Sequence, residues 1–152
     1  MSSLTFWVLV TDSIVYLVAL IIPLYLWSKN KREFLLYFFA LSIDLILVYI
    51  LKITINVPRP QNSLIPLPHS PSFPSTHASL GFFPLGFFFY KKKWRVPLLI
   101  YGSLISYSRV YLGVHYWLDI VVGAPVGFFI GLYFYQYRGK FYKFFSRISN
   151  KK

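Results

Sequence analysis

Residues 34–51 read FLLYFFALSIDLILVYIL, an apolar and aromatic run in which Asp44 is the one charged residue. A helix rises about 1.5 Å per residue, so this run is about 27 Å long, close to the hydrocarbon core of a bilayer at about 30 Å. Charged residues stand directly before it, at 31–33, and Lys52 follows it. The run therefore predicts a transmembrane helix.

Four further apolar runs have the composition of membrane spans: residues 6–27, 78–90, 96–107 and 120–137. The first has no basic residue before it and no small-residue cleavage site after it, which argues against a cleaved signal peptide. The run at 78–90 is short and contains Gly81, Pro84 and Gly86, so it requires a kink, a thin bilayer or shelter among neighbouring helices. We predict an all-α integral membrane protein with five transmembrane helices, or six if one segment is split or re-entrant.

The composition agrees with this class of protein. Of the 152 residues, 57% are hydrophobic, 22% are aromatic and 13% are charged, whereas soluble domains carry about 25% charged residues. The mean hydropathy is +0.56. The chain has no cysteine, which excludes a disulfide scaffold and thiol catalysis. The length predicts a single membrane-embedded domain over residues 1–152.

The placement of the basic residues predicts the orientation. Five alternating spans put residues 28–33, 91–95 and the tail 138–152 on one side, and these segments hold 13 of the 16 basic residues. Because Lys and Arg are concentrated in cytoplasmic loops, this side and the C-terminus are predicted to be cytoplasmic, and the proline-rich stretch 53–75 to lie outside. The tail alternates basic and aromatic residues, as surface-lying amphipathic segments do. The net charge of +12 thus indicates contact with anionic lipid headgroups at the cytoplasmic face, and no nucleic acid.

Three polar segments lie at predicted span ends that face the outside: KITINVPRP at 52–60, PSTH at 74–77 and SRVYLGVHYWLD at 108–119. They carry the three outer cations, two histidines and one carboxylate, which are Lys52, Arg59, Arg109, His77, His115 and Asp119. Charged groups near hydrocarbon are costly and usually mark a site or a pathway. Three cations around one pocket predict an anion site, and the planar fork of arginine suits phosphate.

These segments resemble the three signature motifs of the type-2 phosphatidic-acid phosphatase superfamily, also called lipid phosphate phosphatases. The family pattern is Lys-x6-Arg-Pro, Pro-Ser-Gly-His and Ser-Arg-x5-His-x3-Asp. The first and third motifs match in full, and the second has Thr76 where glycine is usual. The resemblance covers residues 52–119 and extends to small polyprenyl diphosphate phosphatases. Many members of this family have six spans, so a chain with five would be a shortened version.

The residue types also suit phosphoryl transfer. We expect His115 to attack phosphorus and form a phosphohistidine. Asp119, four residues on and one helical turn away, is expected to orient the imidazole and stabilise its positive charge. His77 is expected to protonate the leaving oxygen as a general acid and then to activate water as a general base.

Phosphate binding is assigned to the three cations together with Ser75 and Thr76, at the start of the third helix, whose dipole favours an anion. The cations Lys52, Arg59 and Arg109 supply the positive charge that Mg²⁺ would otherwise supply. We therefore expect metal-independent catalysis, no cofactor and no obligatory protein partner. At Thr76 we expect an ordinary turn whose N–H still faces phosphate.

For a site that faces outside, the resemblance implies hydrolysis of a polyprenyl diphosphate, undecaprenyl or dolichyl, in the outer leaflet of the cell membrane. Alternatives are a phosphatase of phosphatidic acid or phosphatidylglycerophosphate, and a non-catalytic lipid-binding or lipid-moving protein. A haloperoxidase-like function is disfavoured because the chain has almost no mass outside the spans. Asp44 is expected to be a hydrogen-bonded contact in the bundle or a headgroup contact. His69 is expected to be solvated or to gate the substrate.

Overall fold

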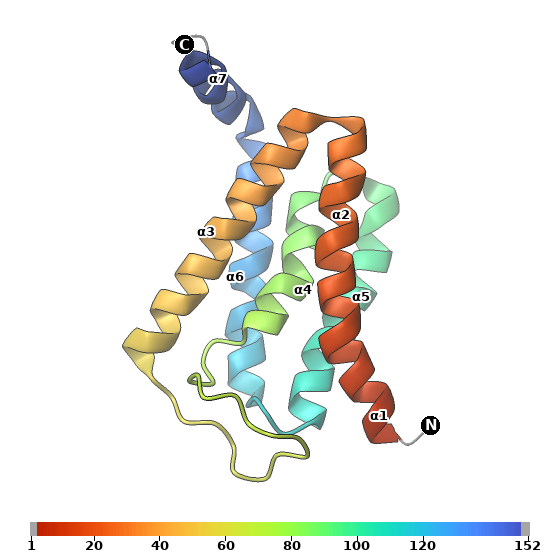
Figure 1. The fold of residues 1–152 in the computed structure, drawn as a ribbon, viewed down its shortest axis with the longest axis vertical. Helices are drawn as coiled ribbons and strands as arrows, with labels where there is room; N and C mark the ends of the chain where they lie inside the picture. Colours follow the sequence, from red (N-terminus) through yellow and green to blue (C-terminus); the bar gives the residue numbers. More distant parts are fainter. Residues whose placement is uncertain (1–2, 150–152) are drawn as a thin grey trace.

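The computed structural model describes residues 3–149, which are mainly helical and contain no strand. In chain order the elements are α1 (Ser3–Val8), the π-helix η1 (Leu9–Ile14), α2 (Val15–Lys29), α3 (Lys31–Ile55), α4 (Thr76–Phe87), α5 (Lys92–Tyr111), α6 (Trp117–Gln136) and α7 (Arg138–Ser149). Figure 1 shows α1, η1 and α2 as one continuous rod and the irregular segment 56–75 at one end of the bundle. We call this the loop end and the opposite end the basic end.

All five apolar runs lie mainly in helices. Within the described residues, α3 and α6 are the two helices long and apolar enough to cross a membrane. The 12 residues of α4 span only about 18 Å, and α5 carries several basic residues in its first turn. The prediction of an all-α chain with apolar helices of membrane-crossing length is thus confirmed, and the count of five spans stays a prediction.

The apolar run at residues 78–90 is sheltered by neighbouring helices. This is one of the three ways in which so short a run could be accommodated. Its helix, α4, packs against α6 and α5 and also against α3 and α2, and Figure 1 shows it in the middle of the bundle. Eight of its 12 residues are buried. Because protein surrounds α4 over most of its length, it does not need the length of a lipid-exposed span.

A row of glycines lets α6 approach α4 closely. A Cβ atom added at any of three glycines of α6 would clash with a carbonyl oxygen of α4 or of its N-cap. It would lie 2.6 Å from Ser75 at Gly123, 2.0 Å from Ser79 at Gly127, and 2.4 Å from Phe83 at Gly131. The spacing of four residues puts all three on one face of α6. Small residues at this spacing are the usual means by which two helix backbones come into contact in membranes. The contact sets the position of the start of α4 relative to the start of α6.

Aromatic side chains fill the core toward the basic end. Tyr37 of α3 makes edge-to-face contacts with Phe83 and Phe87 of α4, with ring centroids 5.1 and 4.9 Å apart. Phe87 also contacts Tyr135 of α6 at 5.4 Å. Such pairs add about 0.5–1.5 kcal/mol beyond the burial of their area. The phenylalanine-rich third run therefore serves packing.

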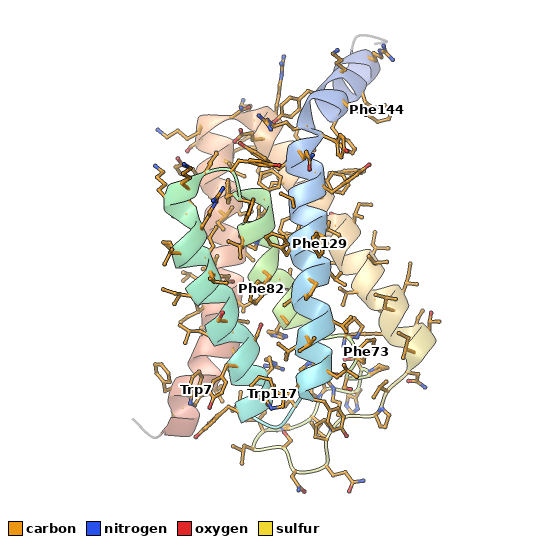
Figure 2. The ribbon with its side chains drawn as sticks, turned by 180° about the vertical axis from the view of Figure 1, so that it is seen from behind. Trp7, Phe73, Phe82, Trp117, Phe129 and Phe144 are labelled. Atoms are coloured by element: carbon orange, nitrogen blue, oxygen red, sulfur yellow. The ribbon has the colours of Figure 1, made fainter. Side chains whose placement is uncertain are left out.

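The tail forms the amphipathic helix α7, which leaves the bundle at the basic end (Figure 1). Phe141 of α7 packs on Phe134 of α6, with ring centroids 4.8 Å apart. Phe144 is 58% exposed and lies at the end of the molecule opposite to Trp7 and Trp117 (Figure 2). Residues 150–152 of the predicted tail lie outside the described residues.

Replacing Gly127 by alanine is expected to destabilise the bundle. The new Cβ atom would lie 2.0 Å from the Ser79 carbonyl oxygen, so the two backbones must separate, and such overpacking costs about 1–3 kcal/mol. The apparent Tm in detergent should fall by about 5 °C. Gly139→Ala is the matched control, because a Cβ atom there meets nothing within 4 Å. An equal Tm for both variants would contradict the close contact.

Candidate active site

The three polar segments meet at the loop end, where α3 and α5 end and α4 and α6 begin (Figure 1). The structure places the predicted site residues as follows: Lys52 in the last turn of α3, Arg59 in the loop, Ser75 as the N-cap of α4, Thr76 and His77 in its first turn, Arg109 in the last turn of α5, His115 just before α6, and Asp119 in the first turn of α6. Four of the ionisable groups among them are almost fully buried, namely Lys52, Arg109, His115 and Asp119. Buried charges of this kind need partners.

His115 and Asp119 form the central pair. The Nδ1 atom of His115 lies 3.0 Å from Oδ2 of Asp119, and both side chains are buried. A charged carboxylate at this position accepts a hydrogen bond from Nδ1–H, so the proton resides on Nδ1 and the lone pair of Nε2 is available. The sequence places an acid–histidine pair here, and the structure brings the two side chains into contact.

The spacing of four residues suggested that His115 and Asp119 lie within one helix. In the structure they do not. His115 precedes α6, which begins at Trp117, and Tyr116 between them is extended (φ −78°, ψ 159°). The Asp119 carboxylate turns back over the start of α6 and accepts the N–H of Tyr116 at 2.9 Å. Asp119 therefore both satisfies a backbone donor at the helix N-terminus and orients the imidazole.

Arg59 lies beside the Nε2 edge of the His115 imidazole, opposite the edge that binds Asp119. Its Nη1 is 3.3 Å from Nε2 of His115 and donates to the Val114 carbonyl at 2.8 Å. Its Nε and Nη2 donate to the carbonyl and the hydroxyl of Ser70, at 2.8 and 3.1 Å. Burial lowers the pKa of Arg59, whereas Asp119 acts in the opposite direction. An arginine remains cationic after such a shift, so a positive charge is held beside Nε2.

Lys52 joins the loop to α3. Its Nζ donates to the carbonyl oxygens of Pro71 (2.8 Å) and Ser72 (3.0 Å). Ser72 is itself buried and binds Pro58 through its hydroxyl at 3.2 Å. An ammonium group has three N–H donors, and these two bonds use two of them. The third can serve an anion at the site.

His77 and Arg109 complete the charged cluster. His77 is the second residue of α4, and the charges of Arg109, His115, Arg59 and Lys52 all act on it. Arg109 is 3% exposed. Because a helix N-terminus carries a partial positive charge, the start of α4 adds to the field of these cations. All the groups predicted to bind phosphate or to move protons therefore belong to one electropositive region.

Ser75 and Thr76 have local roles that the motif alone does not reveal. The Ser75 hydroxyl accepts the N–H of Ala78 at 3.4 Å as the N-cap of α4, and the Ser75 N–H donates to the Asp119 carbonyl at 3.0 Å. Thr76 is the first residue of α4, and among the described non-glycine residues only Asn56 has a positive φ. The backbone at Thr76 is therefore ordinary, and no glycine is required there.

The loop is anchored above the site by contacts that sequence reasoning missed. The N–H of Leu64 donates to the Leu112 carbonyl at 3.0 Å. Gly113 has φ +69°, and a Cβ atom there would lie 2.6 Å from the Asn62 carbonyl oxygen, so this position requires glycine. The acceptors of Lys52 and Arg59 are mostly backbone carbonyl oxygens, which have no signature in a sequence.

The roles of two further residues, Asp44 and His69, were left open by the sequence. Asp44 is fully buried on α3, about 12 Å along the helix from Lys52, and accepts the Ser79 hydroxyl at 2.7 Å. It is thus a hydrogen-bonded contact within the bundle. His69 is exposed on the loop. Within residues 3–149, no group of three or more His, Cys, Asp or Glu side chains could hold a metal ion, and metal independence stays a prediction.

The protonation of His115 provides a test of this geometry. Burial lowers the pKa of His115 to about 4, although the hydrogen bond that His115 donates to Asp119 acts to raise it. Because the ordinary value is about 6.5, the contribution of His115 to stability is complete above about pH 6.5 and is lost as the pH falls through about 4. An NMR titration of ¹⁵N-labelled histidine, with only three His in the chain, should give one midpoint near 4 that moves lower in Asp119→Asn. A midpoint near 6.5 for His115 would contradict its burial.

Comparison with known proteins agrees with the motifs. The family model described as the PAP2 superfamily matches residues 33–143. Undecaprenyl-diphosphatase BcrC of Bacillus subtilis (strain 168) is 29% identical over 140 residues, which cover 86% of this chain and 72% of that protein.

Two solved structures are similar in fold. The crystal structure of Aquifex aeolicus LpxE has a TM-score of 0.76 and 30% identity, over 88% of this chain and 86% of that one. A transmembrane PAP2-type phosphatidylglycerolphosphate phosphatase from Bacillus subtilis has a TM-score of 0.66 and 26% identity, over 90% of this chain and 73% of that one. The prediction of a membrane-protein phosphatase that cleaves a phosphoric ester or anhydride is confirmed. Since the family model covers most of the chain, the chain belongs to the PAP2 superfamily.

Proposed function

We propose that the protein hydrolyses a polyprenyl diphosphate to the monophosphate, without a metal ion, through a phosphohistidine at His115. The observation that carries this proposal is the orientation of the buried imidazole. Asp119 binds Nδ1 at 3.0 Å, and Nε2 faces the guanidinium of Arg59 at 3.3 Å. A nucleophile with an orienting carboxylate on one side and a cation on the other is arranged to attack an anionic phosphorus centre.

The reaction takes place in two balanced steps. Nε2 of His115 forms a bond to the terminal phosphorus, the bond from phosphorus to the bridging oxygen breaks, and the polyprenyl monophosphate leaves with a proton from His77. His77 then takes a proton from water, the water oxygen attacks phosphorus, and the N–P bond breaks to release inorganic phosphate. Arg59, Arg109 and Lys52 stabilise the charge on the non-bridging oxygens in both steps.

The proposed substrate class rests on a relative and on the shape of the chain. BcrC of Bacillus subtilis, which is 29% identical to this chain, is named as an undecaprenyl-diphosphatase. The irregular segment 56–75 is the one long loop of the described residues, so a long-chain substrate would keep its tail in the bilayer and present only its head to the site. Phosphatidylglycerophosphate is the second candidate, because one of the structural neighbours is named as its phosphatase.

We also propose that the chain crosses the membrane five times with the site outside. Residues 28–33, 91–95 and α7, which carry most of the positive charge, lie at the basic end, away from the loop (Figure 1). The positive-inside rule supports a cytoplasmic basic end. Trp7 and Trp117 lie at the loop end (Figure 2), where an interfacial aromatic belt would place them.

Single cysteines test this orientation, because the chain has none of its own. Gln61→Cys is exposed on the loop and Lys140→Cys is exposed on α7. In intact cells a membrane-impermeant maleimide should label the first and not the second, and both should react after lysis. Labelling of Lys140→Cys alone in intact cells would reverse the proposed orientation.

Phosphate release by the purified protein in detergent with EDTA tests the catalytic proposal. Undecaprenyl diphosphate should be hydrolysed, and His115→Ala should lower kcat by on the order of 10³ or more. His77→Ala should lower it by on the order of 10²–10⁴. His69→Ala changes the third, exposed histidine and is the matched control, with activity expected to stay at the wild-type level.

The intermediate distinguishes the mechanism from other routes. With a ³²P-labelled terminal phosphate, an acid-labile and base-stable label should remain on the wild-type protein after quenching in base, and none should remain on His115→Ala. Full activity of folded His115→Ala would show that His115 is not the nucleophile. Faster hydrolysis of phosphatidylglycerophosphate than of polyprenyl diphosphate would favour the second candidate substrate.

A further inference from the structure

A cavity of about 590 Å³ lies between α2 and α5 near the basic end, away from the catalytic cluster. We call it the α2–α5 groove, and its main lining residues are Val18, Ile22 and Tyr25 of α2 and Lys93, Trp94 and Tyr101 of α5. A volume of this size is typical of a site for a small molecule. Figure 1 shows the two helices side by side in this half of the bundle.

The groove combines an apolar interior with a basic mouth. Lys91 and Lys93 line it at the start of α5, beside Trp94, which is 40% exposed. Lys91 also contacts Glu33 at 3.7 Å in a half-exposed pair. An indole beside ammonium groups at the end of an apolar channel is the arrangement that a bilayer interface favours.

The charges at this end favour an anionic occupant. Of the four acidic residues in the chain, only Glu33 belongs to the basic end, since Asp12 lies in η1, Asp44 in the interior of α3 and Asp119 at the start of α6. Eleven of the sixteen basic residues lie in the described segments that form this end, residues 28–33, 91–95 and 138–149. A negatively charged headgroup at Lys91 and Lys93 therefore meets a strongly positive surface.

The groove is separate from the active site. Lys93 and Arg109 are 16 residues apart on the same helix, about 24 Å along its axis. A phosphate bound at the lysines therefore cannot be the phosphate that His115 attacks.

We infer that the α2–α5 groove binds one anionic phospholipid of the leaflet at the basic end, with an acyl chain among the apolar side chains of α2 and α5 and the phosphate at Lys91 and Lys93. Such a lipid would fill the space between α2 and α5, and its binding would stabilise the folded bundle.

Native mass spectrometry of the delipidated full chain in detergent tests this inference, independently of any catalytic activity. Phosphatidylglycerol should be retained on the order of tenfold better than phosphatidylcholine with the same acyl chains. The double variant Lys91→Gln/Lys93→Gln should lose this preference. Lys92→Gln/Lys140→Gln removes the same charge from exposed positions that do not line the groove, and it should keep the preference.

A second pair of variants tests the apolar part. Val18→Trp fills the groove and should reduce retention of both lipids, whereas Leu17→Trp, on the exposed face of the same helix, should not. Equal retention of the two lipids by the wild type, or equal effects of the two lysine double variants, would overturn the inference. A third result would also overturn the inference: Val18→Trp binds phosphatidylglycerol as the wild type does, but its KM is raised for undecaprenyl diphosphate and not for farnesyl diphosphate. The groove would then hold the tail of the substrate.

Discussion

The contact between the backbones of α4 and α6 is the constraint on which the rest of the structure depends. The Ser75 N–H donates to the Asp119 carbonyl at 3.0 Å, and below this bond Gly123 and Gly127 leave no room for a side chain between the helices. The bond joins the residue that caps α4 to the residue that orients His115. His77, two residues after the cap, is thereby held in a fixed relation to His115, the proposed nucleophile. Positioning of this kind contributes to catalysis because the reacting groups need no reorganisation.

The second constraint is electrostatic. Lys52 and Arg109 are almost fully buried in the same region as Arg59, and Asp119 is the single carboxylate among the site residues. Burying several cations around one anion is costly, and the carbonyl oxygens of the loop and of Val114 offset part of this cost by accepting hydrogen bonds from Lys52 and Arg59. These carbonyls carry no net charge, so the excess of positive charge remains. A phosphate group would neutralise it, which explains why such a costly arrangement is useful.

The sequence predicted the ionisable residues of the site because the segments that carry them stand at span ends facing one side, and their spacings match the motifs of the family that the chain resembles. It also predicted helices at each apolar run. It did not predict that His115 lies outside α6, since a spacing of four residues fits both a helical turn and a capping carboxylate. The acceptors of Lys52 lay beyond sequence reasoning, because every residue has a carbonyl. Gly123, Gly127 and Gly131 were not singled out from the sequence, although their spacing of four residues puts them on one helix face; their close approach to α4 is seen only in the structure.

Thr76 occupies a position where the motif usually has glycine. Close packing at the start of α4 needs a residue without a Cβ atom somewhere in the contact, and Gly123 of α6 provides it, since a Cβ atom there would lie 2.6 Å from the Ser75 carbonyl oxygen. Thr76 itself has an ordinary helical backbone as the first residue of α4. A β-branched side chain is tolerated at a helix N-terminus, where the preceding turn that restricts it is absent. The N–H groups of the first turn are thus retained at the site whether this position holds threonine or glycine.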